Sequence, residues 1–470
     1  MEREEIRKKE FEFLLQEYKK SPQLFRRETL IEGPEFLKNF GIFIENQENF
    51  PKGYLKLWPQ DFIVEEIGNE GEKETVYLEP LLKIPFFEEK ATIYATLVKC
   101  NISTIEAQEE LSRKLNLPKE KIQFAGIKDK RALSAQKISI RETSFQEIQE
   151  ITSSYFFLKN IYFGKGVVEK GKIAGNEFTI LVRTTKDFNE EIFWENLKKI
   201  QKEGFYNFYY LQRFATPRLI NYFWGLLILK GEYEKAVLSF LSDSGEKEIP
   251  YFKNLRKKIK ENFGSWEKIE EILNPLPLMF KNELKIVSYL KNHPTDFVGA
   301  LSQIPQQITL WVFALSSWLF NYKLSALIKT KKPIPEKLPL FLSFDKNDWK
   351  IYENFLSKLG IYPPPFENLK PFPFIQIRKR EIKTKEKAQI KKVKIVKEGV
   401  ILNFFLPKGV YATTFLCHLF RLLSGPPPKE IQQTPIDLKE SLGEKSLRET
   451  LNYFQDVISP QSQNIFEKEI

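Results

Sequence analysis

FAGIKDKRALSAQ, residues 124–136, is the stretch of this 470-residue chain on which the interpretation of its fold and chemistry depends. QFAG (123–126) is typical of a short strand, GIKDKRA (126–132) of a loop and QKISI (136–140) of a second strand. The loop places one carboxylate, Asp129, among the cations Lys128, Lys130 and Arg131. Nearby opposite charges favour the ionised carboxylate, which suits a nucleophile or base beside a phosphodiester backbone. The alternative interpretation is a solvated charged turn.

Further strand patterns lie on both sides of this loop. In GYLKLWPQDFIVEEI (53–67) the apolar residues Phe62 and Val64 recur with the period of two that a strand requires. ATIYATLVK (91–99) and GNEFTILVR (175–183) are also read as strands. We therefore expect the loop at residues 126–132 to connect strands of a β-sheet.

Helical patterns come next along the chain. Ser103 and Glu106 have the spacing of a capping box, which predicts a helix beginning there. From about residue 205 to 370 the pattern is mainly helical, and IPQQITLWVFALSSWLFNYKLSALI (304–328) is apolar over enough of its circumference to be largely buried. Strand signals return in VILNFFLP (400–407). This order predicts an α+β fold with a mixed sheet that is interrupted by a mainly helical insertion.

The predicted parts of the chain follow from these changes of pattern. Residues 1–50 are expected to be a helical N-terminal extension, 51–204 and 375–424 the α+β domain, 205–374 the inserted domain, and 425–470 a polar tail with one or two surface helices. No internal repeat is found.

The rare residues restrict the chemistry. Cys100 and Cys417 are the only cysteines, and His293 and His418 the only histidines. A Cys/His metal cluster or a disulfide framework cannot be built from this set. We therefore expect no metal and no cofactor, and chemistry that depends on carboxylates, lysines, hydroxyls or amides.

Charge and hydropathy indicate the partner and the compartment. The formal net charge of +11 and the pI near 9.1 suit a polyanion such as RNA. The segment from Arg378 to Lys397 holds ten Lys or Arg against two Glu and is expected to lie along an RNA path. The N-terminus lacks the apolar stretch of a signal peptide, and no window approaches twenty apolar residues. We expect a cytoplasmic protein without a membrane span and without an obligatory protein partner.

Five motifs in order resemble the TruD family of pseudouridine synthases. The central run matches G-x-K-D-x-x-A-x-[T]-x-Q, with Ser134 where threonine is usual. The other four are GYLKLWPQDFIVEE (53–66), GKIAGNEFTILVR (171–183), NFYYLQRFA (207–215) and LPKGVYATTF (406–415). Any one match would be unremarkable, but all five in the family's order are specific.

The resemblance implies a fold, a reaction and a set of site residues. The family joins a pseudouridine synthase catalytic domain to an inserted TruD domain, with a basic cleft between them that accepts tRNA or other structured RNA, and its members modify uridine 13. The catalytic aspartate of the family corresponds to Asp129, the basic residue near that aspartate to Lys56, and the aromatic residue beside the target base to Phe178. The substrate-binding residues that the resemblance implies are Lys56, Phe62, Glu66, Lys128, Gln136, Asn176, Phe178 and Arg213.

Three positions depart from the family pattern. Tyr210 and Ala215 replace the glycines of the family's NYFGxQRFG run, so the backbone could follow a different course there. Ala174 replaces a lysine that often precedes the GN pair, which removes a phosphate contact.

Two other functions fit parts of the sequence. One is a catalytically silent RNA-binding protein on the same fold. The other is a metal-dependent nuclease with Asp61, Glu65 and Glu66 as ligands. Glu65 and Glu66 are neighbours in a strand and point to opposite faces, which disfavours the nuclease.

Overall fold

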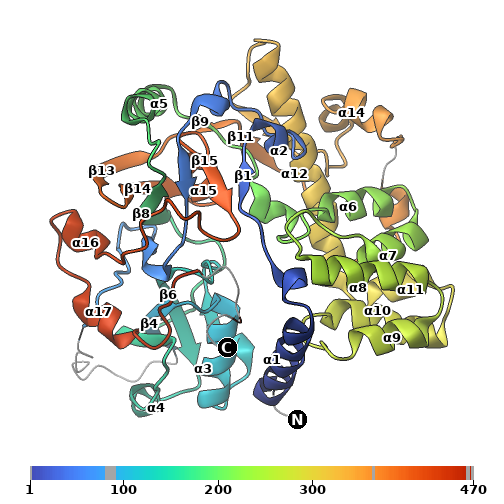
Figure 1. Cartoon of the computed structure of the whole chain (residues 1–470), viewed down its shortest axis with the longest axis horizontal. Helices are drawn as coiled ribbons and strands as arrows, with labels where there is room; N and C mark the ends of the chain where they lie inside the picture. Colours follow the sequence, from blue (N-terminus) through green and yellow to red (C-terminus); the bar gives the residue numbers. More distant parts are fainter. Residues whose placement is uncertain (1–2, 80–91, 363–365, 462–465, 467–470) are drawn as a thin grey trace.

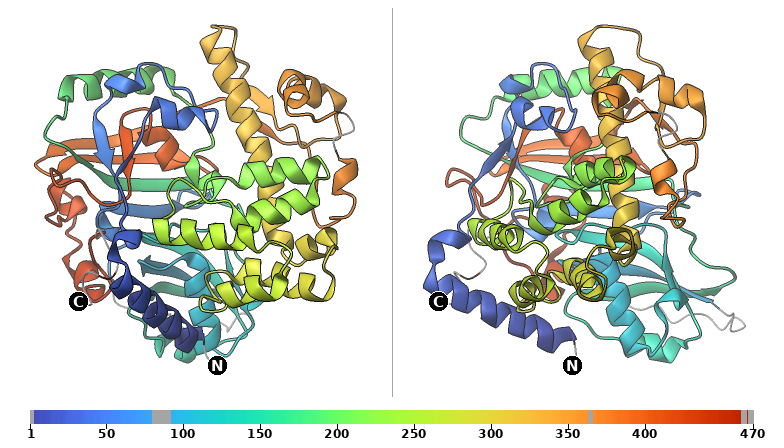
Figure 2. Two further views of the ribbon diagram at one scale, coloured as in Figure 1. Left: turned by 45° about the vertical axis from the view of Figure 1, so that its right-hand side comes forward. Right: turned by 90° about the vertical axis from the view of Figure 1, so that its right-hand side faces the viewer.

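The computed structural model describes residues 3–79, 92–362, 366–461 and 466. A sheet-containing part and a helical part lie side by side, and the N-terminal helix lies between them at one end (Figure 1). Figure 2 shows the same arrangement from two further directions. The predicted strand at 91–99 is found as Thr92–Cys100, and its first residue lies outside the described ranges.

Among the described residues, the sheet has eleven strands and is mixed. The main path runs β1-β15-β2-β8-β3-β6-β4-β7, with β14 and β13 added beside β8 and β5 beside β6. The strands are β1 (Leu30–Glu32), β2 (Lys52–Tyr54), β3 (Phe62–Ile67), β4 (Thr92–Cys100), β5 (Ile122–Phe124), β6 (Leu133–Arg141), β7 (Phe156–Gly164), β8 (Gly175–Thr184), β13 (Gln389–Val396), β14 (Gly399–Pro407) and β15 (Arg421–Ser424).

Strand β3 occupies the middle of this sheet. It pairs antiparallel with β8 and parallel with β6, and its register sets Val64 opposite Phe178 and Glu66 opposite Asn176. The predicted alternation is present, but both faces of the strand are buried, and Glu65 is therefore buried too. The cause is that the sheet is covered on both sides.

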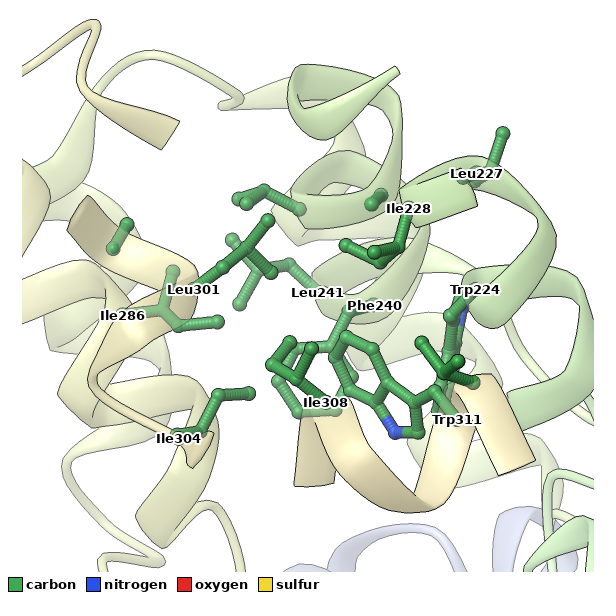
Figure 3. Packing of buried hydrophobic residues seen from close by; sticks show 14 of the residues in the cluster. Trp224, Leu227, Ile228, Phe240, Leu241, Ile286, Leu301, Ile304, Ile308 and Trp311 are labelled. Atoms are coloured by element: carbon green, nitrogen blue, oxygen red, sulfur yellow. The ribbon is translucent and has the colours of Figure 1, made fainter. Parts of the chain in front are cut away.

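The helical part runs from α6 (Asn221–Leu229) to α12 (Pro305–Lys329) and confirms the predicted helix at 304–328. Between them lie α7 (Tyr233–Ser242), α8 (Pro250–Glu261), α9 (Trp266–Leu273), α10 (Lys281–Asn292) and α11 (Phe297–Ser302). Trp224 and Trp311 pack with Phe240 at the centre of its core (Figure 3). Helix α12 also contributes Phe320 and Leu324 to the core under the sheet, so one long helix joins the two parts.

The remaining helices surround the sheet or follow the helical part. They are α1 (Arg3–Lys20), α2 (Pro34–Lys38), α3 (Thr104–Lys114), α4 (Phe145–Gln149), α5 (Glu190–Glu203), α13 (Lys346–Lys350), α14 (Glu353–Lys358), α15 (Ala412–Leu416), α16 (Leu438–Ser441) and α17 (Arg448–Tyr453). Short strands β9 (Phe205–Tyr206), β12 (Lys385–Glu386), β10 (Lys337–Pro339) and β11 (Glu381–Lys383) form two further pairs. The predicted capping box of α3 is present. The α+β fold with a helical insertion is thus confirmed.

Both chain ends contact the sheet, which the sequence did not indicate. The first fifty residues are not only helical, because Leu30–Glu32 forms β1 beside β15. The C-terminal tail does form two helices, but Leu438, Leu447 and Phe454 are buried against the sheet together with Ile63. The predicted surface helices are present as α16 and α17, and what the sequence did not indicate is that widely spaced apolar residues of this polar segment converge on one sheet face.

None of the described helices combines the length and the apolar character that crossing a bilayer requires.

Candidate active site

Asp129 lies in the loop between β5 and β6, which we call the catalytic loop (residues 126–131). Neighbouring side chains hold the main chain of this loop. Thr104 Oγ1 accepts a hydrogen bond from the Lys128 amide at 2.9 Å and donates one to Gln136 Oε1 at 2.9 Å. Gln136 Nε2 in turn donates to the Gly126 carbonyl at 3.1 Å. Buried hydroxyl and amide groups therefore fix the loop before Asp129.

Two basic side chains fix the rest of the catalytic loop. Lys99 Nζ lies 2.8 Å from the Asp129 carbonyl oxygen. Arg131 donates to the carbonyl oxygens of Lys56 at 2.8 Å, Leu57 at 2.5 Å and Ser459 at 2.8 Å. The loop is thus tied to β4, to the segment before β3 and to the C-terminal tail.

The Asp129 carboxylate is accessible, unlike the main chain of the catalytic loop. Its side chain is 44% exposed, and its Oδ2 lies 3.2 Å from Lys56 Nζ. Lys56 has a φ of +60°, in the left-handed region that few non-glycine residues adopt, and its ammonium also lies 4.1 Å from the centre of the Phe62 ring. The exposed carboxylate of Asp129 is therefore paired with a lysine whose own position is restrained.

The cations next to Asp129 in the sequence have other partners. Lys130 pairs with Glu106 at 3.1 Å, and Arg131 binds main-chain carbonyls. Lys128 is buried, and its ammonium lies 2.7 Å from Glu66 Oε2 and 2.6 Å from Asn176 Oδ1. The sequence neighbours of Asp129 therefore do not surround it with cations as expected, and its ion pair among the described residues is made by Lys56, the basic residue that the motifs implied near the aspartate.

Glu66, Lys128 and Asn176 form a connected polar group beside Asp129. Glu66 and Asn176 face each other across β3 and β8, and the Lys128 ammonium bridges them. The structure therefore brings together seven of the nine predicted site residues by direct contacts or register, and Gln136 through the main chain of the catalytic loop. These are Lys56, Phe62, Glu66, Lys128, Asp129, Asn176 and Phe178.

Phe178 lies in the sheet below this group. Its ring packs edge-on against Phe62 at a centroid distance of 6.0 Å and stacks on Phe404 at 5.4 Å. Only 6% of Phe178 is exposed. The ring is therefore part of the core as well as a neighbour of the polar group.

Arg213 lies apart from this cluster. Its guanidinium donates to Ser317 Oγ at 2.9 Å and to the Phe313 carbonyl oxygen at 3.4 Å, both on α12. Among the described residues, no contact joins Arg213 to Asp129 or its neighbours. Arg213 therefore connects the segment 207–215, which precedes the helical part, to helix α12.

The two positions where glycine was expected have different consequences. Ala215 has a φ of +61°, so the backbone keeps the left-handed conformation that glycine adopts most readily. Tyr210 is extended and buried, and its hydroxyl binds Glu32. Ala215 thus adopts a conformation that glycine would also allow, and Tyr210 adds a contact to β1.

The carboxylates of the nuclease hypothesis do not converge. Asp61 is bound by Arg183 Nε at 2.7 Å, Glu65 by Lys439 at 2.9 Å on the opposite face, and Glu66 by Lys128. Within the described ranges, no group of three or more His, Cys, Asp or Glu side chains is placed to hold a metal ion. Each of these carboxylates is instead paired with one cation or, in the case of Glu65, with two lysines.

A hollow of about 920 Å³ borders the catalytic loop on one side. Its lining includes Lys130 and Ile102 beside the loop, Lys281 of the helical part and Arg7 of α1. Arg7 contacts Glu106 at 2.9 Å, and Glu10 of the same helix accepts hydrogen bonds from the amides of Leu278 and Met279. Helix α1 therefore bridges the two parts of the molecule at the edge of this hollow.

The sequence interpretation missed Lys99 and Thr104, which hold the catalytic loop. Lys99 stands in the apolar strand ATLVKC, and a lysine inside an apolar strand was the available signal. Thr104 follows the capping serine of α3, and nothing in its sequence position indicates a contact with a loop 24 residues away.

Comparisons with known proteins agree with one another. The sequence profile of the family described as "tRNA pseudouridine synthase D (TruD)" matches residues 42–340. A protein of Methanosarcina mazei named "probable tRNA pseudouridine synthase D" is 28% identical over 448 residues, covering 82% of this chain and 97% of the relative. The Aquifex aeolicus tRNA pseudouridine synthase D is 25% identical over 358 residues, covering 73% of this chain and 90% of the relative.

The fold has a counterpart among solved structures. A crystal structure from Methanosarcina mazei that bears the TruD name superposes with a TM-score of 0.63 at 25% identity. The match covers 83% of this chain and 98% of that one. The matched profile begins at residue 42, so α1 and β1 lie before it.

Proposed function

This chain belongs to the TruD family of tRNA pseudouridine synthases and is an isomerase, and we propose that it converts uridine 13 of tRNA to pseudouridine with Asp129 as the catalytic residue. The observation that supports Asp129 is that its main chain is fixed while its side chain is accessible. Its main chain is bound to a buried lysine, while its carboxylate is exposed and paired with Lys56. A catalytic group needs this combination of a fixed position and free access.

The proposed reaction detaches the base from the ribose, turns it and rejoins it through carbon. It has no net oxidation or reduction, so the protein has to supply only binding, orientation and one ionised group. The carboxylate could serve by attack on the base, by attack on the sugar or by removal of a ribose proton. Each route requires the Asp129 anion beside the nucleotide, and Lys56 holds that anion in place.

The target uridine must leave its stack before the carboxylate can reach it. We propose that it enters beside Asp129 and contacts Phe178 and the Glu66–Lys128–Asn176 group. Asn176 is the member of this group that is not buried, so its amide is available to the base. Lys56 is half-buried and can also contact a phosphate.

Gln136 receives a different role in this proposal. It is fully buried, and both ends of its amide are already hydrogen-bonded, to Thr104 and to Gly126. We therefore assign it to holding the catalytic loop instead of binding the substrate. Arg213 likewise is assigned to the junction with α12.

We keep the division into domains as part of the proposal. Residues 51–204 and 375–424 would form the catalytic domain, with 205–374 as the insertion. Both ends of the chain then belong to the catalytic domain as well, because β1 extends the sheet and α16 and α17 cover it. The cytoplasm remains the predicted compartment.

The proposal is tested by incubating the purified protein with a tRNA transcript and mapping pseudouridine at single-nucleotide resolution. We expect one modified position, uridine 13, and none in a matched transcript with cytidine at that position. A transcript without any pseudouridine would favour the silent RNA-binding protein. Modification only at another uridine would retain the enzyme and overturn the proposed position.

A further inference from the structure

Lys99 is a buried lysine at the back of the catalytic loop. It belongs to β4, is 0% exposed, and stands opposite Ser134 of β6 and Phe156 of β7. Its ammonium lies 2.8 Å from the carbonyl oxygen of Asp129 and 2.8 Å from that of Ile102. Lysines are almost never fully buried without a paired charge, yet among the described residues no ion pair includes Lys99. Its direct partners are two main-chain carbonyls.

The charges around Lys99 belong to the active site. The Asp129 carboxylate attracts its ammonium, while Lys128 and Lys56 repel it, and the remaining titratable neighbour is the buried thiol of Cys100. Burial outweighs these interactions and lowers the pKa of Lys99 to about 7. The charge of this lysine is therefore lost as the pH rises through about 7, a range in which an ordinary lysine stays protonated.

A purely structural role does not explain the choice of residue. A neutral donor could satisfy the two carbonyl oxygens without the desolvation penalty of an ammonium, whereas an apolar side chain would leave them unpaired. What lysine adds is a positive charge directly behind the main chain of Asp129. That charge strengthens the hydrogen bonds to both carbonyls and attracts the Asp129 carboxylate.

We propose that Lys99 is a positioning residue for the catalytic aspartate, whose buried ammonium fixes the Asp129 main chain and holds the carboxylate in its reactive position. This inference rests on the proposed catalytic role of Asp129. Lys99 does not touch the substrate and acts only through the loop. Because the ammonium loses its proton on the alkaline side, the reaction slows as the pH rises.

The test compares pH profiles of kcat/KM on a tRNA transcript, since these report groups of the free enzyme. The profiles cover about pH 6 to about pH 8.5, below the ionisation of the uracil ring. The variants are Lys99→Met, Lys99→Arg and a matched control, Lys159→Met. Lys159 lies in β7, is also fully buried, and binds Thr75 and Glu79 at 2.7 and 3.0 Å instead of the catalytic loop.

We expect wild type and Lys159→Met to lose kcat/KM as the pH rises through about 7. Lys99→Met should be slower by about 10²-fold at low pH, as for a displaced catalytic group, and its profile should be flat. Lys99→Arg should keep activity and also lose the alkaline decline, because a guanidinium stays protonated. Binding of tRNA should be the same for all four proteins.

Three results would overturn the proposal: a flat wild-type profile, a Lys99→Met variant with the wild-type rate, or a slow Lys99→Met variant that keeps the wild-type decline. The wild-type profile decides the matter even where a variant does not fold. Absence of pseudouridine from wild type would instead contradict the proposed function, so the two failures are distinguishable.

Discussion

Phe178 is the residue at which core packing and substrate contact meet. Its ring is held between Phe62 and Phe404, and 6% of it is exposed. A flipped uracil would therefore contact only a small part of this residue. Aromatic packing and base contact predict different losses when this ring is removed.

Phe178→Leu should lower both stability and turnover. Loss of an aromatic pair reduces the free energy of unfolding by about 0.5–1.5 kcal/mol beyond the change in buried area. Loss of a base contact of about 1–3 kcal/mol corresponds to a single-turnover rate that is about 5- to 150-fold lower. Urea denaturation and single-turnover assays measure the two effects, and the affinity for tRNA should stay close to wild type.

The matched control is Phe404→Leu, which removes the stacking partner of Phe178 from a fully buried position. It should lower stability without an equal loss of rate. If Phe178→Leu and Phe404→Leu lose the same stability and both keep the wild-type rate, Phe178 serves the core alone.

At the scale of residues, the sequence predicted identities better than contacts. Asp129, Asn176 and Phe178 were identified from motifs, and the structure places all three in the same cluster of predicted site residues. The motifs implied Lys56 as the basic residue near Asp129, and the two side chains form an ion pair, whereas the cations next to Asp129 in the sequence have other partners. Lys128 forms an ion pair with Glu66 of β3. The sequence did not indicate this pair, because β4 and β5 lie between the two residues in the chain.

Among the elements, the catalytic loop depends most on its neighbours. Its main chain is held by Thr104 of α3, Lys99 of β4 and Gln136 of β6, so three separate elements fix six residues. Thr104 is fully buried and uses its hydroxyl both as acceptor and as donor. It is therefore the tether whose loss leaves most groups unpaired.

Thr104→Val keeps the shape of the side chain and removes both hydrogen bonds. The main-chain amide of Lys128 and the side-chain oxygen Oε1 of Gln136 are left buried without their partner, which costs about 1–3 kcal/mol in the free energy of unfolding. The loosened loop should also lower the rate of pseudouridine formation while tRNA affinity is unchanged. Thr104→Ser retains the hydroxyl and is the control, so equal behaviour of the two variants would contradict this account.

At the scale of elements, local signals were reliable and pairing was not. The capping box of α3 and the long helix α12 were predicted because they depend on residues close in the chain. Strand β1 was missed because three residues carry little periodicity, and their strand character comes from pairing with β15 almost four hundred residues later. The cover of the sheet by α16 and α17 was missed for the same reason.

On the scale of the whole molecule, the basic segment from Arg378 to Lys397 contains lysines that are bound within the protein and lysines that are not. Three of its exposed lysines are already engaged within the protein: Lys391 with Glu177, Lys392 with Glu444 and Lys394 with the Ser441 carbonyl oxygen. Three others are exposed without an ion pair among the described residues, namely Lys385, Lys387 and Lys397. The second set has no ion pair to break before it binds phosphates, and neither have the exposed Arg378 and Arg380 among the described residues.

Two charge-matched triple variants test this division. Alanine at Lys385, Lys387 and Lys397 should flatten the dependence of log Kd on log salt by about 0.7–0.9 for each lost phosphate contact. Alanine at Lys391, Lys392 and Lys394 should leave that slope near wild type. Equal slopes for both variants and wild type would show that the segment is only a solvated face.

The central claim is that Asp129 carries out the reaction, and one substitution tests it most directly. Asparagine has nearly the shape of aspartate but cannot act as an anionic nucleophile or base. Asp129→Asn should fold, bind tRNA at least as tightly because one negative charge is removed, and form no detectable pseudouridine. Asp187→Asn, at another exposed aspartate, is the control and should keep wild-type activity. Wild-type pseudouridine formation by Asp129→Asn would contradict the account.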